Sequence, residues 1–157
     1  MNIWQWQDKT HVIADFPNGA QIRLTIGACS GYESGVYGVF MQEARNHVKE
    51  VYGQESSDFL DNATPEQLVE WSCYYQRSIM LSCLLTVESR EDESSEWELD
   101  ELPAEWRAIS TFAKAVPFRL FNDWLTTCYE LNPGVFNSAD DDSKKKSVHS
   151  SVVKLMN

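Results

Sequence analysis

The chain has 157 residues, 43% of them hydrophobic and 12% aromatic, and a formal net charge of −11; this size and apolar content suit one domain with a sizeable core. The excess of acids argues against a general nucleic-acid binder, because phosphate neutralisation needs clustered Lys and Arg side chains. No run approaches the roughly 18 apolar residues of a membrane span, and the first residues lack the basic and apolar regions of a signal peptide, so we expect a cytoplasmic protein without membrane contact.

The N-terminal part predicts a β-hairpin. Two β-prone runs, His11–Phe16 and Ala20–Ile26, flank the turn residues Pro17-Asn18-Gly19. An Asn-Gly pair between two such runs is the strongest short-range sign of a hairpin. We therefore predict a hairpin over Val12 to Ile26.

Two helices are predicted next. Val36 to Tyr52 carries apolar residues on one face, and Gly53 suits the position that ends a helix. After a polar linker, Gln54 to Ala63, the run Thr64-Pro65-Glu66-Gln67 combines an N-cap Thr, a Pro in the first turn and a Gln at the third helical position. We expect this helix to run to about Val87 and to form the centre of the core, because its second half is apolar almost all round.

Glu88 to Glu101 is the most acidic part of the chain, with eight acids against Arg90 alone. Because it holds few apolar residues to bury, we expect an exposed loop. One interpretation is a solvated acidic loop without a partner. The other is an acidic docking segment for a basic partner surface, with Trp97 and Leu99 as apolar anchors.

Leu102 to Gly134 predicts two short amphipathic helices, with Pro103 in the first turn of one and Pro117 in the first turn of the other. Aromatic residues at helical spacing usually belong to a core. A sharper hypothesis reserves Trp106 and Trp124 for a protein partner, because Trp is enriched at interface hot spots.

No motif in the sequence predicts catalysis, a cofactor site or a metal site. The glycines that follow the hairpin match no nucleotide-binding motif. We expect reduced thiols, without a CxxC pair or a His at metal-ligand spacing, at all four cysteines: Cys29, Cys73, Cys83 and Cys128. We therefore predict a protein that is not an enzyme and uses neither cofactor nor metal.

These elements predict one α+β domain over residues 1–137, in which the N-terminal β-hairpin packs on a mainly α-helical body. Residues 138–157 contain opposite charge blocks and few apolar residues, so we expect a disordered, flexible charged tail. The sequence leaves the oligomeric state open.

The order of these parts resembles the tail assembly chaperones of long-tailed bacteriophages. The hairpin, the helical body and the acidic connection are followed by Leu102-Pro103, an aromatic helix pair and a closing Leu131-Asn132-Pro133. The resemblance implies a non-catalytic protein of the host cytoplasm that binds the tape measure protein and tail tube subunits during tail morphogenesis. The resemblance assigns no functional role to any individual residue of this chain. The alternatives are an acidic inhibitor or nucleic-acid mimic that occupies a basic site on a host protein, and an unclassified structural or interaction protein.

Overall fold

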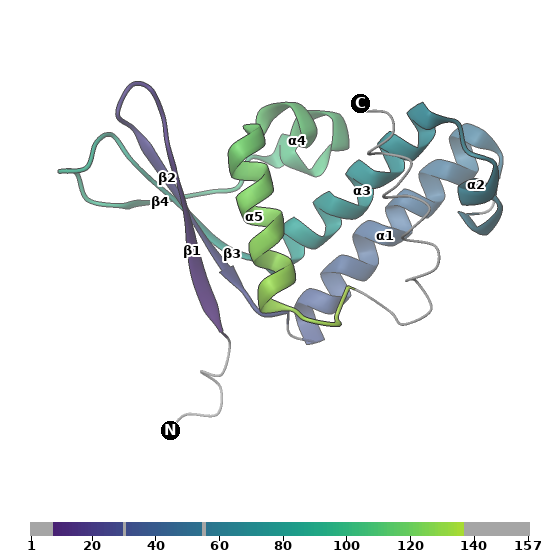
Figure 1. The fold of residues 1–157 in the computed structure, drawn as a ribbon, viewed down its shortest axis with the longest axis horizontal. Helices are drawn as coiled ribbons and strands as arrows, with labels where there is room; N and C mark the ends of the chain where they lie inside the picture. The colour runs from purple at the N-terminus through teal and green to yellow at the C-terminus, as the bar shows by residue number, and fades with distance from the viewer. Residues whose placement is uncertain (1–7, 30, 55, 137–157) are drawn as a thin grey trace.

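The computed structural model describes residues 8–29, 31–54 and 56–136, which form an α+β arrangement of a four-stranded antiparallel sheet and a helical body (Figure 1). The α+β class predicted from the sequence is therefore confirmed. The predicted tail, residues 138–157, and its boundary with the domain lie outside the described residues.

The sheet begins with the predicted hairpin. Strands β1 (Lys9–Asp15) and β2 (Gln21–Gly27) pair antiparallel along their full length. The turn between them depends on Gly19, whose φ of 89° lies in the left-handed region that L side chains rarely adopt. The Asn18 side chain closes the turn by accepting a hydrogen bond of 3.1 Å from the Ala20 N–H.

Helix α1 (Gly31–Tyr52) ends as expected at Gly53, whose φ of 67° allows the chain to leave the helix. Helix α2 (Ser56–Asn62) occupies the segment that the sequence predicted as a polar linker, so that prediction is wrong. Its Phe59 is 1% exposed and stacks on the ring of Tyr52. One buried aromatic residue thus fixes a segment that is otherwise polar.

Helix α3 (Pro65–Cys83) begins with the predicted cap. The Thr64 hydroxyl accepts a hydrogen bond from the Gln67 N–H, and the Gln67 side chain accepts one from the Thr64 N–H. The helix ends before the predicted Val87, because the chain passes directly into strand β3 (Leu84–Arg90). An apolar run does not by itself distinguish a buried helix from a buried strand, which explains the error.

The acidic segment is a hairpin rather than a loop. Its first residues complete strand β3, and strand β4 (Glu98–Asp100) pairs antiparallel with β3. The order of strands in the sheet is β1-β2-β3-β4, so the acidic hairpin forms the edge opposite β1. The predicted loop over Glu88 to Glu101 is correct only for the turn between the two strands.

Three further helices follow: the 3₁₀ helix η2 (Ala104–Arg107), α4 (Ile109–Ala115) and α5 (Phe118–Leu131). The chain breaks at Pro117 as predicted, because proline cannot continue the helix before it. The first of the two expected helices is itself divided, since Ala108 is extended between η2 and α4.

Helix α5 covers one face of the sheet and separates it from the other helices (Figure 1). It packs on β1 and β2 on one side and on α3 on the other. The core between these layers combines strand residues with helix residues: Val12, Leu24, Ile26, Val87, Ile79, Phe112, Leu120, Trp124 and Cys128. No described helix lies on the opposite face of the sheet, which we call the outer sheet face.

Candidate protein-binding face

The outer sheet face carries one row of side chains across all four strands. Because side chains alternate along a strand, residues that pair across the sheet share a face, and this row contains Ile13, Arg23, Glu88 and Leu99. Ile13 is 51% exposed at one end of the row, and Leu99 is 73% exposed at the other. Two apolar side chains are therefore open to solvent at the two edges.

Arg23 and Glu88 form a two-pronged ion pair in the middle of this row. The Arg23 Nε lies 2.8 Å from one carboxylate oxygen of Glu88, and its Nη2 lies 2.7 Å from the other. These hydrogen bonds lower the pKa of the Glu88 carboxyl and raise the pKa of Arg23. The paired geometry fixes the direction of both side chains and favours their charged forms.

Trp97 holds the β3–β4 turn against the outer sheet face. The guanidinium carbon of Arg23 lies 4.4 Å from the centre of a Trp97 ring, and that of Arg90 lies 4.5 Å from it. Both distances suit cation–π contacts. Arg90 also donates to the Gln21 side chain at 2.6 Å and to the Glu93 carbonyl at 3.0 Å. These contacts order a turn that contains few apolar residues.

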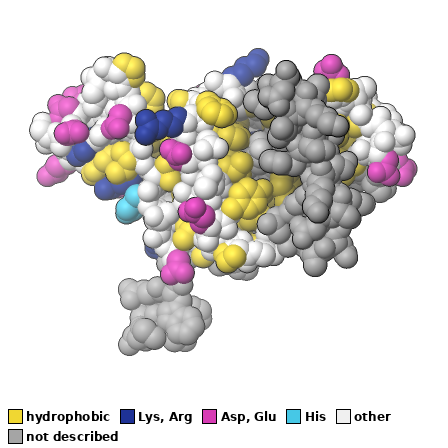
Figure 2. Space-filling model, in the orientation of Figure 1, with side chains coloured by type: hydrophobic (Ala, Val, Ile, Leu, Met, Phe, Trp, Pro, Cys, Tyr) yellow, Lys and Arg dark blue, Asp and Glu magenta, His cyan; other side chains and the backbone are white. Residues whose placement is uncertain are grey.

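Exposed carboxylates flank Trp97 and Leu99 in the acidic hairpin. Figure 2 shows Asp and Glu side chains gathered at the end of the molecule where the β3–β4 turn lies. All are exposed: Glu91, Asp92, Glu93, Glu96, Glu98, Asp100 and Glu101. Asp92 has a structural task, because hydrogen bonds from Ser94 and Ser95 to its carboxylate shape the turn and lower the pKa of Asp92. Because Glu98 and Asp100 pair with Ser89 and Val87, they point to the other face of the sheet from Leu99. The carboxylates therefore form a negative rim along the β4 edge, beside the apolar side chains of the outer sheet face.

The structure separates the predicted partner-binding residues into two groups. Trp97 and Leu99 both lie on the side of the outer sheet face, which is compatible with the hypothesis of an acidic docking segment. Trp106 and Trp124 lie on the other side of the sheet, with ring centres 6.5 Å apart, and both rings pack on Phe112.

Trp124 is 0% exposed, so the prediction that it contacts a partner is corrected. The apolar stripe of α5 faces the sheet and α3, which places this ring in the core. Trp106 is half-buried against the same cluster, so part of its ring remains accessible and its contact with a partner stays a prediction. The interpretation of these aromatic residues as core therefore holds for Trp124.

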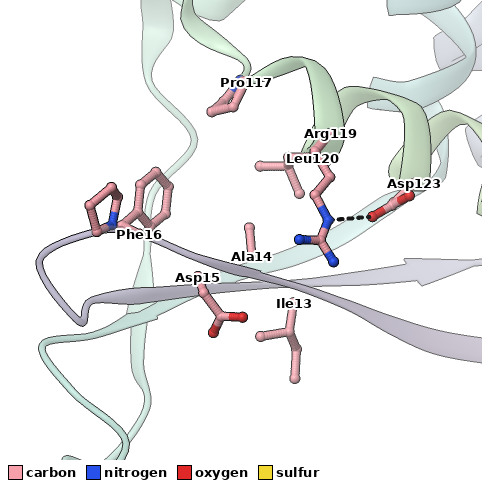
Figure 3. Close-up of a pocket in the computed structure, with 9 residues that line it drawn as sticks. Ile13, Ala14, Asp15, Phe16, Pro117, Arg119, Leu120 and Asp123 are labelled. Atoms are coloured by element: carbon pink, nitrogen blue, oxygen red, sulfur yellow. Dashed lines mark ion pairs between the residues drawn. The ribbon is translucent and has the colours of Figure 1, made fainter.

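A groove of about 310 Å³ lies beside strand β1, between its last residues and the start of α5 (Figure 3). Its lining comes from both elements: Ile13, Ala14, Asp15, Phe16, Pro17, Pro117, Arg119, Leu120 and Asp123. Ala14 points toward Leu120, whereas Ile13 and Asp15 point away from α5. Next to this groove, Phe118 is 82% exposed. The sequence does not predict this groove, because the groove depends on how α5 lies on the sheet.

A cluster of titratable residues joins α1 to α3. The Glu70 carboxylate accepts a hydrogen bond from the Tyr52 hydroxyl, and its other oxygen lies 2.8 Å from the His47 Nε2. The hydrogen bond to Glu70 raises the pKa of Tyr52 to about 12. Because these groups bind one another across the helix pair, we interpret the cluster as a clamp between two helices.

Two cysteines meet in the core beside Asn132. The Asn132 Nδ2 donates to the Cys128 carbonyl at 2.8 Å and lies 3.5 Å from the Cys83 sulfur. A hydrogen bond with the Cys83 thiol and burial raise the pKa of Cys128, so both favour the neutral thiol. Within the described ranges, no group of three or more His, Cys, Asp or Glu side chains is placed to hold a metal ion.

No protein-family model, curated protein or solved structure matches this chain. The function is therefore inferred from the residues and the geometry of the surface. In the part of the chain that the structure describes, no helix has the length and apolar character needed to cross a membrane.

Proposed function

We propose that this chain is a non-catalytic protein-binding protein, and that it serves as a tail assembly chaperone of a long-tailed bacteriophage in the host cytoplasm. Its partners are then the tape measure protein and tail tube subunits. The observation that supports the binding role is the exposure of Leu99, which is 73% exposed in strand β4, two residues from Trp97 and next to a rim of exposed carboxylates.

An apolar side chain within a polar rim is the usual composition of a protein-binding surface. The apolar part supplies affinity, and the charged rim steers a basic partner and excludes acidic ones. A chaperone must also release its client during assembly. A small apolar patch with exposed charges suits reversible binding, because exposed charges are screened and contribute little to the final affinity.

The phage assignment is supported by the order of the parts. The chain has an N-terminal hairpin, a helical body, an acidic connection and a helix pair whose second helix begins after Pro117. This is the order of parts that resembles the tail assembly chaperones. The acidic connection is folded as β3–β4 rather than open. It therefore presents Leu99 in one fixed position to a client.

The test is binding of the full chain to purified segments of a tape measure protein from the same phage genome, measured by isothermal titration calorimetry. We expect Leu99→Ala to weaken binding at least about tenfold, the usual scale of a hot spot. The matched control is Val51→Ala at the end of α1, which is 57% exposed but distant in sequence from the acidic hairpin. Binding by this control should equal binding by the parent.

Two further measurements separate the parts of the proposal. Raising the salt concentration should weaken binding, since the carboxylate rim steers association. Equal binding by the parent and by Leu99→Ala would remove the outer sheet face from the proposal. Failure of every tape measure segment to bind would refute the phage assignment.

The acidic inhibitor or nucleic-acid mimic is the second candidate, because the β3–β4 hairpin presents a dense group of exposed carboxylates. A mimic binds through charge, so substitution of Glu96 and Glu98 by Gln should abolish its binding while Leu99→Ala has little effect. The chaperone proposal predicts the opposite ranking. The same calorimetric series, with a nucleic-acid-binding host protein as the ligand, decides between them.

A further inference from the structure

Among the strands of residues 8–29, 31–54 and 56–136, β1 is the outermost one on the side of the sheet away from the acidic hairpin. Its hydrogen bonds define which residues face the open edge. Asp8 accepts from the Ala28 N–H, and Phe16 donates to the Ala20 carbonyl, both at 2.9 Å. Even-numbered residues of this segment therefore bond to β2, because the two directions alternate along an antiparallel strand.

The odd-numbered residues present their N–H and C=O groups at the open edge, and all four have exposed side chains: Lys9, His11, Ile13 and Asp15. An unpaired edge is a template for another strand, and proteins commonly protect such edges with Pro or with charged side chains, Lys in particular. Strand β1 contains no Pro, and its charged residues, Lys9 and Asp15, lie at opposite ends and have opposite signs.

We propose that two copies of this chain pair antiparallel through their β1 strands, with Lys9 of each copy opposite Asp15 of the other. In this register His11 lies opposite Ile13, so every outward-facing residue meets an outward-facing residue. The two-fold axis passes beside Val12. The two sheets then form one continuous sheet of eight strands with a self-complementary interface, as two-fold symmetry requires.

Other registers are less favourable for reasons that the strand itself provides. A shift by one residue sets outward-facing residues opposite inward-facing ones and removes the hydrogen-bond ladder. A shift by two residues keeps part of the ladder but separates Lys9 from Asp15. Oppositely charged cross-strand pairs stabilise a sheet and like charges destabilise it, so the full-length register is selected.

The charge complementarity exists only between two copies. Within one strand, Lys9 and Asp15 are six residues apart, which is about 20 Å at the usual rise per residue. The pairing is also compatible with the proposed function but does not depend on it, because it uses the strand edge and leaves Leu99 at the opposite edge of each sheet.

The test is sedimentation velocity of the full chain over a wide concentration range, with three charge variants. The parent should sediment at twice the mass of one chain. Lys9→Asp and Asp15→Lys should each raise the dimer Kd at least about tenfold, because each places like charges opposite one another twice. The double variant, Lys9→Asp with Asp15→Lys, should restore the Kd of the parent.

This series separates the register from net charge. Asp15→Lys makes the chain less negative, so a net-charge effect would strengthen association where the proposed register weakens it. The variant also loses the hydrogen bond from the Gln21 side chain, so its far-UV circular dichroism and thermal melt serve as folding controls.

A backbone variant provides an independent check. Ile13→Pro removes an outward N–H and leaves the bonds between β1 and β2 in place, so we expect a folded single chain. If the parent sediments as one chain at every concentration, the proposal is overturned. A dimer that persists in all the charge variants, or a double variant without rescue, also overturns it.

Discussion

Replacing Leu24 with Ala tests the assignment of the two sheet faces. Leu24 is 0% exposed and lies opposite Val12 and Val87 beneath α5. The substitution removes about three methylene equivalents, each worth about 0.8 kcal/mol, and leaves a cavity. We therefore expect a loss of about 2–5 kcal/mol in the free energy of unfolding, a large part of the 5–15 kcal/mol that is typical of a domain.

The matched control is the same substitution at Leu99, on the outer face of the same sheet. Leu99 is 73% exposed, so Leu99→Ala should change the free energy of unfolding by no more than about 0.5 kcal/mol. The assay is equilibrium unfolding in urea, followed by tryptophan fluorescence and far-UV circular dichroism. Equal slopes against urea for the variants are needed to compare the midpoints directly.

The test compares the loss in the free energy of unfolding between the two variants. Similar losses for Leu24→Ala and Leu99→Ala would show that the face opposite α5 is also covered. A loss of unfolding free energy below about 0.5 kcal/mol for Leu24→Ala would show that the register of β2 is shifted by one residue, because such a shift moves every side chain of the strand to the other face.

Two other changes test local features. The lowered pKa of Glu88 means that its ion pair with Arg23 stabilises the fold above the usual carboxyl pKa of 4.5 and loses this effect as pH falls through the folded pKa; Glu88→Gln should therefore flatten the acid side of the stability profile in a pH series of urea melts. Gly53→Ala should cost about 1 kcal/mol in thermal melts, since φ is 67° and open space surrounds the site. Gly38→Ala, within α1 and equally unobstructed, should leave stability unchanged or raise it.

The parts of the fold that the sequence predicted depend on local chemistry. The turn at Asn18-Gly19, the cap at Thr64 and the break at Pro117 each involve residues that are close in the sequence. Such signals act through backbone dihedral angles and short hydrogen bonds, so a single sequence contains them in full.

The errors concern contacts between distant segments. Phe59 turns an expected linker into a helix because its ring packs on Tyr52 and Trp71. Trp97 orders the acidic turn because Arg23, 74 positions away in sequence, lies under its ring. Periodicity reports neither contact. The same limit explains Trp124, since a stripe of aromatic residues does not reveal whether the surface that it faces belongs to the same chain or to a partner.

The two edges of the sheet differ in a way that determines how far association can proceed. Strand β4 has only three residues, and its Glu98 and Asp100 are exposed, so a second β4 would meet like charges. A short, acidic edge of this kind resists strand addition. Strand β1, in contrast, is longer and carries charges of both signs. Pairing through β1 alone is isologous and uses the same edge of both copies, so it closes at two copies. The sedimentation experiment therefore has one more expected result: the mass should reach that of two chains and should not increase further with concentration.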